Sequence, residues 1–433
     1  MSIRVSTSNF FDRGVASITE RQSALLDIQQ QVATGRRVSR PSDDPIAAGR
    51  ILDLSQAQSI NKQYVTNSDS AKSSLGLAEQ SLQSVVASLQ NVRATIVAAG
   101  NPTLGDSGRA TLSRELAGMY QELLGLANAT DEQGNHLFSG FRGSAIPFSE
   151  SSPGNVQYAG DQGQRLLQIS ASRFIPVSDA GSEIFQRIRT GNGDFAALAG
   201  AANGGTGRIG IGAVIDPAAW NATGNPSNFT LRFDVSSTTV PATTTYDIVD
   251  NVSGNSLLTG AAASLTGPYL RTFTPGSALN LTSQGAEPPF NYGANVVIEA
   301  SPADGDTFTL AQSPNQSMFS TINNLINALR TTTSTPAQSA RLSNDLTAAA
   351  ANIDQAINRV LDVQTAVGAR QKEVESTQNT SRDIAVQYEA TVSGLRDLDY
   401  AKAISDLNLQ NTLLEAAQKS FVRVQGLSLF DVL

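Results

Sequence analysis

The chain has 433 residues, a net charge of −8 and no cysteine, which excludes a disulfide framework and a thiolate metal site. Basic residues are scattered, so no nucleic-acid surface is expected, and no apolar run approaches the ~18 residues of a membrane span. Aromatic residues make up only 6% of the chain, which favours slender helices in close contact. The first residues lack the apolar core of a cleavable secretory signal, so composition alone favours a cytoplasmic protein.

The first predicted helix runs from about Val5 to Ala33 and ends before Gly35, a usual helix terminator. Its apolar residues recur at steps of three and four, with Gln22 and Gln29 at the two polar positions. The predicted seam consists of Phe11, Val15, Ile18, Leu25 and Val32. A seam this narrow is stable only when another helix covers it.

A linker and a second helix start are predicted within Pro41, Ser42, Asp43, Asp44 and Pro45. Ser42 or Asp43 can cap the helix, and the carboxylates favour the positive end of its dipole. Pro45 is tolerated in a first helical turn because its missing N–H has no partner there.

Two further helices follow, one along 54–96 and one along 112–126, and the short loop between them makes them antiparallel. Asp131 to Asn135 then reads as a turn, and His136 to Phe141 is predicted as a strand. His136 is the only histidine, and we interpret it as structural or solvent-facing rather than catalytic.

Residues 146–312 are rich in Gly, Ser, Thr and Pro and carry short alternating runs, typical of a small sandwich or barrel. Strands are predicted at 229–235, 244–248 and 306–310, and a short helix at 183–189. The carboxylates of this insert stand singly at turns, and no spacing indicates the facing pair that glycoside hydrolysis needs. No enzyme activity is therefore expected.

Helical periodicity returns at 318–329, along 342–398 and again to the end of the chain. In the last helix Asn411 and Gln418 fill the polar positions of the seam. The predicted assembly residues of this helix are Ile404, Leu407, Leu414, Phe421, Leu427, Leu429 and Phe430.

These patterns predict an α+β protein whose long N- and C-terminal helices pair as a coiled coil or helical-bundle rod, with an inserted all-β domain. Residues 1–40 and 396–433 form the terminal coiled-coil domain, which we expect to order only in an assembly because its helices are short and polar. Residues 41–145 and 316–395 form a helical rod with a β-hairpin, and 146–315 a β-rich outer domain. No cofactor or metal is expected.

Segments near both ends resemble one family of bacterial flagellar proteins. They are Ile3-Arg-Val-Ser-Thr-Ser-Asn-Phe10, Thr34-Gly-Arg-Arg-Val38 with Pro41-Ser-Asp-Asp-Pro-Ile-Ala-Ala48, Leu126-Ala-Asn-Ala-Thr-Asp131 with Gly134-Asn-His-Leu-Phe-Ser-Gly-Phe141, and Asp397-Leu-Asp-Tyr-Ala-Lys-Ala-Ile404 with Phe421-Val-Arg-Val-Gln-Gly-Leu-Ser-Leu-Phe430. In these segments the chain is similar to the hook-associated protein 3 family. These are the hook–filament junction proteins of FlgL type, which are relatives of flagellin. The resemblance does not extend to the β insert.

This resemblance implies a structural subunit whose terminal helices form an inner coiled-coil tube of the flagellum, with the β insert outside. It implies assembly with hook-associated protein 1, with flagellin and with other copies in a junction ring. It also implies export by the flagellar type III system without a cleaved signal, and a cytosolic chaperone on the C-terminal helix. The implied location is extracellular, between hook and filament.

Three other interpretations remain open at this point. The chain could be flagellin itself or the larger hook-associated protein, although the tail of flagellin usually differs. It could be a secreted enzyme or glycan-binding module built on residues 146–312. It could be a type III tip or translocator protein, which the lack of an apolar membrane segment disfavours.

Overall fold

The computed structural model describes residues 7–236 and 242–430, and describes side chains from Phe11 to Arg423 outside that gap. The chain divides into two compact units. The first unit comprises Met1–Asp69, Gln168–Arg173 and Glu375–Leu433, and the second comprises Ser70–Leu167 and Phe174–Val374. The three-part domain scheme drawn from the sequence stays a prediction.

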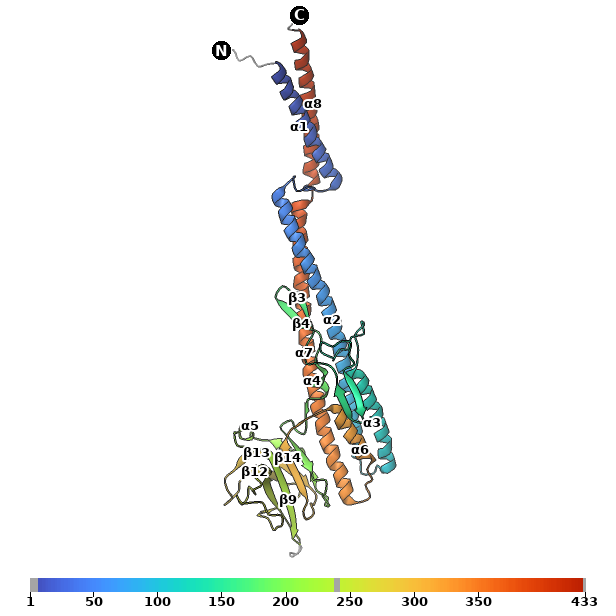
Figure 1. The fold of residues 1–433 in the computed structure, drawn as a ribbon, viewed down its shortest axis with the longest axis vertical. Helices are drawn as coiled ribbons and strands as arrows, with labels where there is room; N and C mark the ends of the chain where they lie inside the picture. Colours follow the sequence, from blue (N-terminus) through green and yellow to red (C-terminus); the bar gives the residue numbers. More distant parts are fainter. Residues whose placement is uncertain (1–6, 237–241, 431–433) are drawn as a thin grey trace. The chain divides into compact units, whose positions relative to one another are not determined.

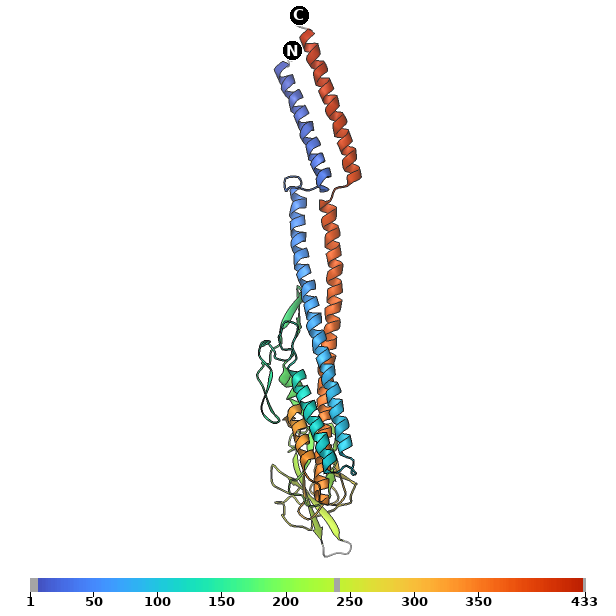
Figure 2. The same ribbon diagram turned by 90° about the vertical axis from the view of Figure 1, so that its right-hand side faces the viewer.

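Helices build most of the first unit (Figures 1 and 2). They are α1 (Thr7–Thr34), α8 (Tyr400–Phe430), the first part of α2 (Pro45–Ala99) and the last part of α7 (Pro336–Arg396). Polar residues on the facing sides of α2 and α7 pair with one another here. The Asn61 amide donates to the Ser381 carbonyl at 2.6 Å, and Gln378 donates to Asp69 at 2.5 Å.

A helical bundle forms one part of the second unit. It combines the rest of α2 and α7 with α3 (Asp106–Ala127) and α6 (Met318–Arg330). Residues seven apart on α2, such as Leu75, Leu82 and Leu89, are at most 1% exposed, and Leu116 of α3 is fully buried. Because the apolar residues repeat at helical spacing, the sequence predicted these helices correctly.

The segment between α3 and the first strand differs from the prediction. His136 to Phe141 is not a strand; it contributes two isolated bridges, one between Thr130 and His136 and one between Ser139 and Ala180. The Asp131 carboxylate accepts hydrogen bonds from the backbone N–H groups of Gln133 and Asn135, which tightens the chain into a turn. His136 is half-buried, and its Nδ1 lies 2.8 Å from the Asn128 carbonyl, which fits a structural role.

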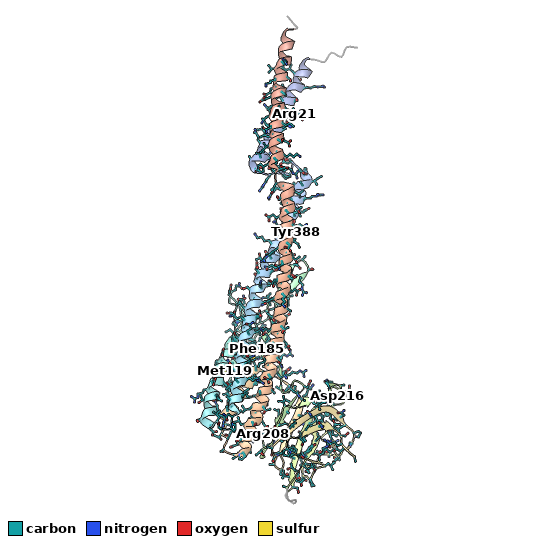
Figure 3. The ribbon with its side chains drawn as sticks, turned by 180° about the vertical axis from the view of Figure 1, so that it is seen from behind. Arg21, Met119, Phe185, Arg208, Asp216 and Tyr388 are labelled. Carbon is teal, nitrogen blue, oxygen red and sulfur yellow. The ribbon has the colours of Figure 1, made fainter. Side chains whose placement is uncertain are left out.

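The described residues also form three two-stranded sheets and a short helix. The pairs are β1 (Phe148–Ser152) with β2 (Asn155–Tyr158), β3 (Leu166–Ser170) with β4 (Arg173–Pro176), and β5 (Ile188–Arg189) with β15 (Asn315–Gln316). Helix α4 (Gly181–Phe185) lies near the short helix expected from the sequence. Phe185, labelled in Figure 3, stacks at 6.1 Å on Phe319 of α6, so an aromatic contact fastens this segment to the bundle.

A β-sandwich forms the other part of the second unit (Figure 1). Its five-stranded sheet has the order β11 (Arg271–Thr272), β10 (Thr243–Asp250), β9 (Asn228–Ser236), β14 (Thr307–Gln312) and β6 (Phe195–Ala199). Its second sheet has the order β12 (Ala278–Thr282), β13 (Asn291–Glu299) and β7 (Arg208–Ile209), with β8 (Ala213–Val214) also on β13. Helix α5 (Pro217–Trp220) is capped by Asp216, which Figure 3 labels.

The core of the sandwich lies between the two sheets. On β9 the alternate residues Phe229, Leu231 and Phe233 are at most 1% exposed and meet Val296 and Ile298 of β13 in the same cluster. This alternation confirms the half-buried strands expected from the sequence.

A buried ion pair holds β11 against the second sheet. Arg271 donates to both carboxylate oxygens of Glu287, at 2.8 and 2.6 Å, and to the carbonyls of Asn280 and Thr282. These bonds to Arg271 hold the pKa of Glu287 below its ordinary value. The guanidinium also lies 5.8 Å from the centre of the Phe290 ring.

Two asparagines of α7 join the sandwich to the bundle. The buried Asn344 amide accepts from the Ile209 N–H at 2.9 Å and donates to the Gly207 carbonyl at 3.2 Å. Two turns further along, Asn352 accepts from the Gly191 N–H at 2.8 Å. The Asn344 side chain therefore satisfies backbone groups at β7, an edge strand that would otherwise be open.

Candidate functional site: the terminal helix pair and its linkers

Helices α1 and α8 form an antiparallel pair. Both seams follow steps of three and four, the spacing of a coiled coil. The buried or half-buried residues of the seam are Phe11, Gly14, Ile18, Arg21, Leu25, Ile28 and Val32 on α1, and Ala403, Leu407, Gln410, Leu414, Ala417 and Phe421 on α8. Most of these side chains are only half-buried, so the pair alone covers little apolar surface.

An aromatic contact closes one end of the seam. The rings of Phe11 and Phe421 meet edge to face, with centroids 5.2 Å apart. Gly14 lies beneath the Phe421 ring, and a Cβ at position 14 would stand 2.7 Å from it. A residue without a side chain is therefore needed where the two helices approach here.

A polar contact lies in the middle of the seam. Arg21, labelled in Figure 3, donates to the Gln410 side chain at 3.4 Å. A polar pair within an apolar seam is satisfied in one register only, so this contact favours the observed alignment of α1 and α8.

Some residues of the predicted seam lie outside the contact between α1 and α8, and their assembly role stays a prediction. Val15 is 52% exposed and Ile404 is 49% exposed, and Gln22, Gln29, Asn411 and Gln418 are exposed as well. The predicted seam and the observed seam both follow alternating steps of three and four. Both include Phe11, Ile18, Leu25 and Val32 on α1, and Leu407, Leu414 and Phe421 on α8. They differ only in the residues between, where the folded pair uses glycine, arginine and isoleucine on α1 and alanine and glutamine on α8. The side chains of Leu427, Leu429 and Phe430 lie outside the described residues.

Apolar side chains remain exposed on the outside of the pair. They are Val15, Leu26, Ile404, Leu409, Leu413 and Val422. The sequence analysis placed only two of these among the assembly residues. The signal that could have found the others is that each helix carries more apolar residues than one two-helix seam can hold.

The two linkers of the terminal pair run side by side. Gly35 ends α1 with a φ of 69°, a conformation that suits glycine. Arg36 and Asp397 then form a backbone bridge, the Arg37 N–H donates to the Arg396 carbonyl at 2.8 Å, and the Leu398 N–H donates to the Gly35 carbonyl at 3.0 Å. Each linker thus satisfies backbone groups of the other.

Arg37 fastens both linkers with its side chain. It donates to the Leu395 carbonyl at 2.6 Å and forms an ion pair with Asp44 at 3.0 Å. Asp44 also caps α2, because its carboxylate accepts from the Ala47 N–H, and these two bonds hold its pKa below the ordinary value.

The cap of α2 corrects the expectation from the sequence, which placed it at Ser42 or Asp43. Asp43 instead accepts from the N–H groups of Arg40 and Ser39, and the bond from Arg40 is the main cause of its lowered pKa. Pro45 is the first helical residue, so the preceding Asp44 occupies the capping position. Pro41, Ser42 and Pro45 are exposed.

Both ends of the chain match models of flagellin. Residues 5–142 match the bacterial flagellin N-terminal helical region, and residues 350–433 match the C-terminal helical region. The flagellar hook-associated protein 3 of Salmonella typhimurium is 36% identical over 186 residues, which is 43% of this chain and 58% of that protein.

Solved structures extend the similarity beyond the two ends. The crystal structure of Xanthomonas campestris FlgL is 30% identical, with a TM-score of 0.60, and the match covers 72% of this chain and 91% of that one. The chain belongs to the hook-associated protein 3 (FlgL) family. The flagellar junction protein FlgL of Legionella pneumophila is 28% identical, with a TM-score of 0.68, covering 80% of this chain and all of that one.

Membership of the FlgL family makes the chain a structural component of the flagellum, and its relatives are structural proteins rather than enzymes. No helix within residues 7–236 and 242–430 is long and apolar enough to cross a membrane. In the same residues no cluster of His, Asp and Glu side chains could hold a metal ion. The exposed apolar side chains of the terminal pair make it the candidate functional site.

The cysteine-free chain allows a direct test of the helix register. A Gly14→Cys, Phe421→Cys variant is expected to form an intramolecular disulfide rapidly, because these positions face each other in the seam. The matched control is Ser17→Cys with Phe421→Cys, since Ser17 is exposed on α1. Oxidation is followed by gel mobility with and without reductant. Equal rates for both variants would contradict the register described here.

Proposed function

We propose that this FlgL family member joins the hook to the flagellin filament through head-to-tail assembly of its terminal helices. The observation that carries the proposal is the exposed apolar surface of the α1–α8 pair, which includes Val15, Ile404 and Val422. Apolar side chains exposed on a helix pair are a feature of surfaces that bind other proteins. Neighbouring terminal pairs in a tube are such partners, and successive heterologous contacts close a ring or continue a helix.

The proposed partners follow from this assembly. Hook-associated protein 1 contacts one side of the subunit ring, flagellin contacts the other side, and copies of this chain contact each other within the ring. Before assembly, a cytosolic export chaperone covers the C-terminal helix. The chain is exported by the flagellar type III system and functions outside the cell. The Legionella pneumophila relative, a flagellar junction protein, supports this role.

The experiment that tests the proposal is complementation of a gene deletion. Cells without the gene are expected to keep their hooks and to release flagellin monomer into the medium. Full-length protein is expected to restore filaments, whereas protein lacking residues 396–433 is not. Normal filaments in the deletion strain, or full rescue by the truncated protein, would overturn the proposed junction role.

A second candidate function is that of a filament subunit. The matches of both ends to flagellin helical regions favour it. The two candidates differ in self-assembly, because a filament subunit polymerises without limit in vitro, whereas a junction subunit stops at a ring. Light scattering of the purified full chain distinguishes these outcomes.

A further inference from the structure

A hollow of about 520 Å³ is lined mainly by residues of α6, α7 and strand β6. This volume falls within the roughly 300–1,000 Å³ of most small-molecule sites. Its walls combine apolar atoms, such as those of Leu198, Leu325 and Ala349, with side-chain amides and hydroxyls. Asp345 of α7 is the one charged residue among the described residues that line it. The hollow therefore offers both an apolar wall and a negative charge.

The Asp345 carboxylate has no partner of its own. Within the described residues, no hydrogen bond or ion pair reaches it, although the side chain is exposed. The surrounding atoms remove part of its hydration, and this desolvation raises the pKa of Asp345 above the ordinary value. Arg341, one turn earlier on α7, acts on the carboxylate through its charge, but its guanidinium donates to the Ala201 carbonyl. The carboxylate is thus free to accept from a bound cation.

The last turn of α6 adds to the negative character of the hollow. Asn327 and Ala328 line the hollow from this turn, and so does Thr331, the C-cap residue of α6. The carbonyl end of a helix carries a partial negative charge that attracts cations within about one turn. Arg330 is the basic residue of the last turn, and it does not line the hollow. A carboxylate and a helix C-terminus therefore border one hollow that has no cation among its lining residues.

We propose that this hollow binds an alkylammonium group, the charged end of a free aliphatic amine or of a lysine side chain. An ammonium group has three N–H donors and no acceptor, so it suits the Asp345 carboxylate and the side-chain oxygens of Asn324 and Asn327. The alkyl stem packs on the apolar atoms of Leu325 and Ala328, as the stems of lysine side chains do elsewhere. The site uses no residue of the terminal helix pair and does not depend on the junction role.

The probe for this site is n-butylamine, because it reproduces the end of a lysine side chain, and n-butanol is its uncharged counterpart. Each is added at neutral pH to the isotope-labelled full chain, and the side-chain amide resonances of Asn324 and Asn327 are followed by NMR. Butylamine is expected to shift these resonances at about millimolar concentration, whereas butanol is expected to bind at least about tenfold more weakly. Equal shifts with both compounds, or no shift with butylamine, would overturn the proposal.

Two variants test the role of the carboxylate. Asp345→Asn removes the charge and keeps the size of the side chain, so it is expected to weaken butylamine binding about tenfold. Asn324→Lys places an ammonium group at the hollow from α6 and is expected to abolish the binding of added amine. The control is Asp304→Asn, which makes the same change in net charge at an exposed position that does not line the hollow. Unchanged butylamine affinity in Asp345→Asn would contradict the site.

Protein concentration distinguishes the two sources of the ammonium group. Another copy of the chain can supply it, since exposed lysines stand at Lys62, Lys72, Lys372, Lys402 and Lys419. Without added amine, shifts that grow with protein concentration and disappear in Asp345→Asn would assign the site to a lysine of a second copy. Shifts that appear only when butylamine is added would assign the site to free amines.

Discussion

Replacing Arg271 by methionine is expected to lower the free energy of unfolding of the β-sandwich by about 3–5 kcal/mol. The Arg271 and Glu287 side chains are only 6% and 10% exposed. Without the guanidinium, the Glu287 carboxylate and the carbonyls of Asn280 and Thr282 lose a shared donor inside the protein. An unpaired buried charge is costly because water does not replace the lost partner.

Chemical denaturation followed by tryptophan fluorescence measures this effect. Trp220 is the single tryptophan, and it lies in the sandwich core at 5% exposure, so its emission reports on this part of the chain. The control is the double variant Arg271→Met, Glu287→Leu, which removes both charges together. It is expected to unfold less readily than the single variant, because no charge is left unpaired. Equal losses in both variants would show that the ion pair is not the cause.

Leu414→Asp is expected to abolish filament growth in the complementation assay. Leu414 lies half-buried in the α1–α8 seam. It follows Gln410, which contacts Arg21, by about one helical turn of α8. An aspartate there places a carboxylate in an apolar seam that is already narrow, and the pair gains too little from burial to tolerate it. Filaments are counted by electron microscopy, and released flagellin is measured in the medium.

Gln418→Asp is the matched control for this variant. It introduces the same carboxylate one turn further along α8, at an exposed position outside the seam. Cells carrying it are expected to grow filaments as the unmodified protein does. If Leu414→Asp also restored filaments, the seam between α1 and α8 would not be needed for assembly.

The helices and the main strands could be predicted because their apolar residues repeat with the period of each element. Leu75, Leu82 and Leu89 mark α2 in this way, and Phe229, Leu231 and Phe233 mark β9. The strand expected at His136 to Phe141 failed for a local reason. Its apolar residues Leu137 and Phe138 are buried, and Phe138 packs on Phe185, but the chain turns here instead of extending, and periodicity does not distinguish the two.

The candidate site was predictable only in part. The seam residues shared by both registers, such as Ile18 and Leu407, were found, whereas Gly14 and Arg21 were missed because neither is apolar. Their places depend on Phe421 and Gln410, which lie about four hundred residues away in the chain. The pairing of the two linkers was missed for the same reason, since Arg37 acts on the Leu395 carbonyl.

The paired linkers also determine how the subunit responds to force. A single connecting segment between helices acts as a swivel, about which the attached part turns freely. Here two linkers connect the helices, one after α1 and one before α8. The Arg36–Asp397 bridge and the Arg37 side chain join these two linkers. Tension on the terminal pair is therefore divided between two backbones, and twisting one of them requires breaking hydrogen bonds to the other. Torque is transmitted through such a joint, whereas a single flexible tether would dissipate it as rotation.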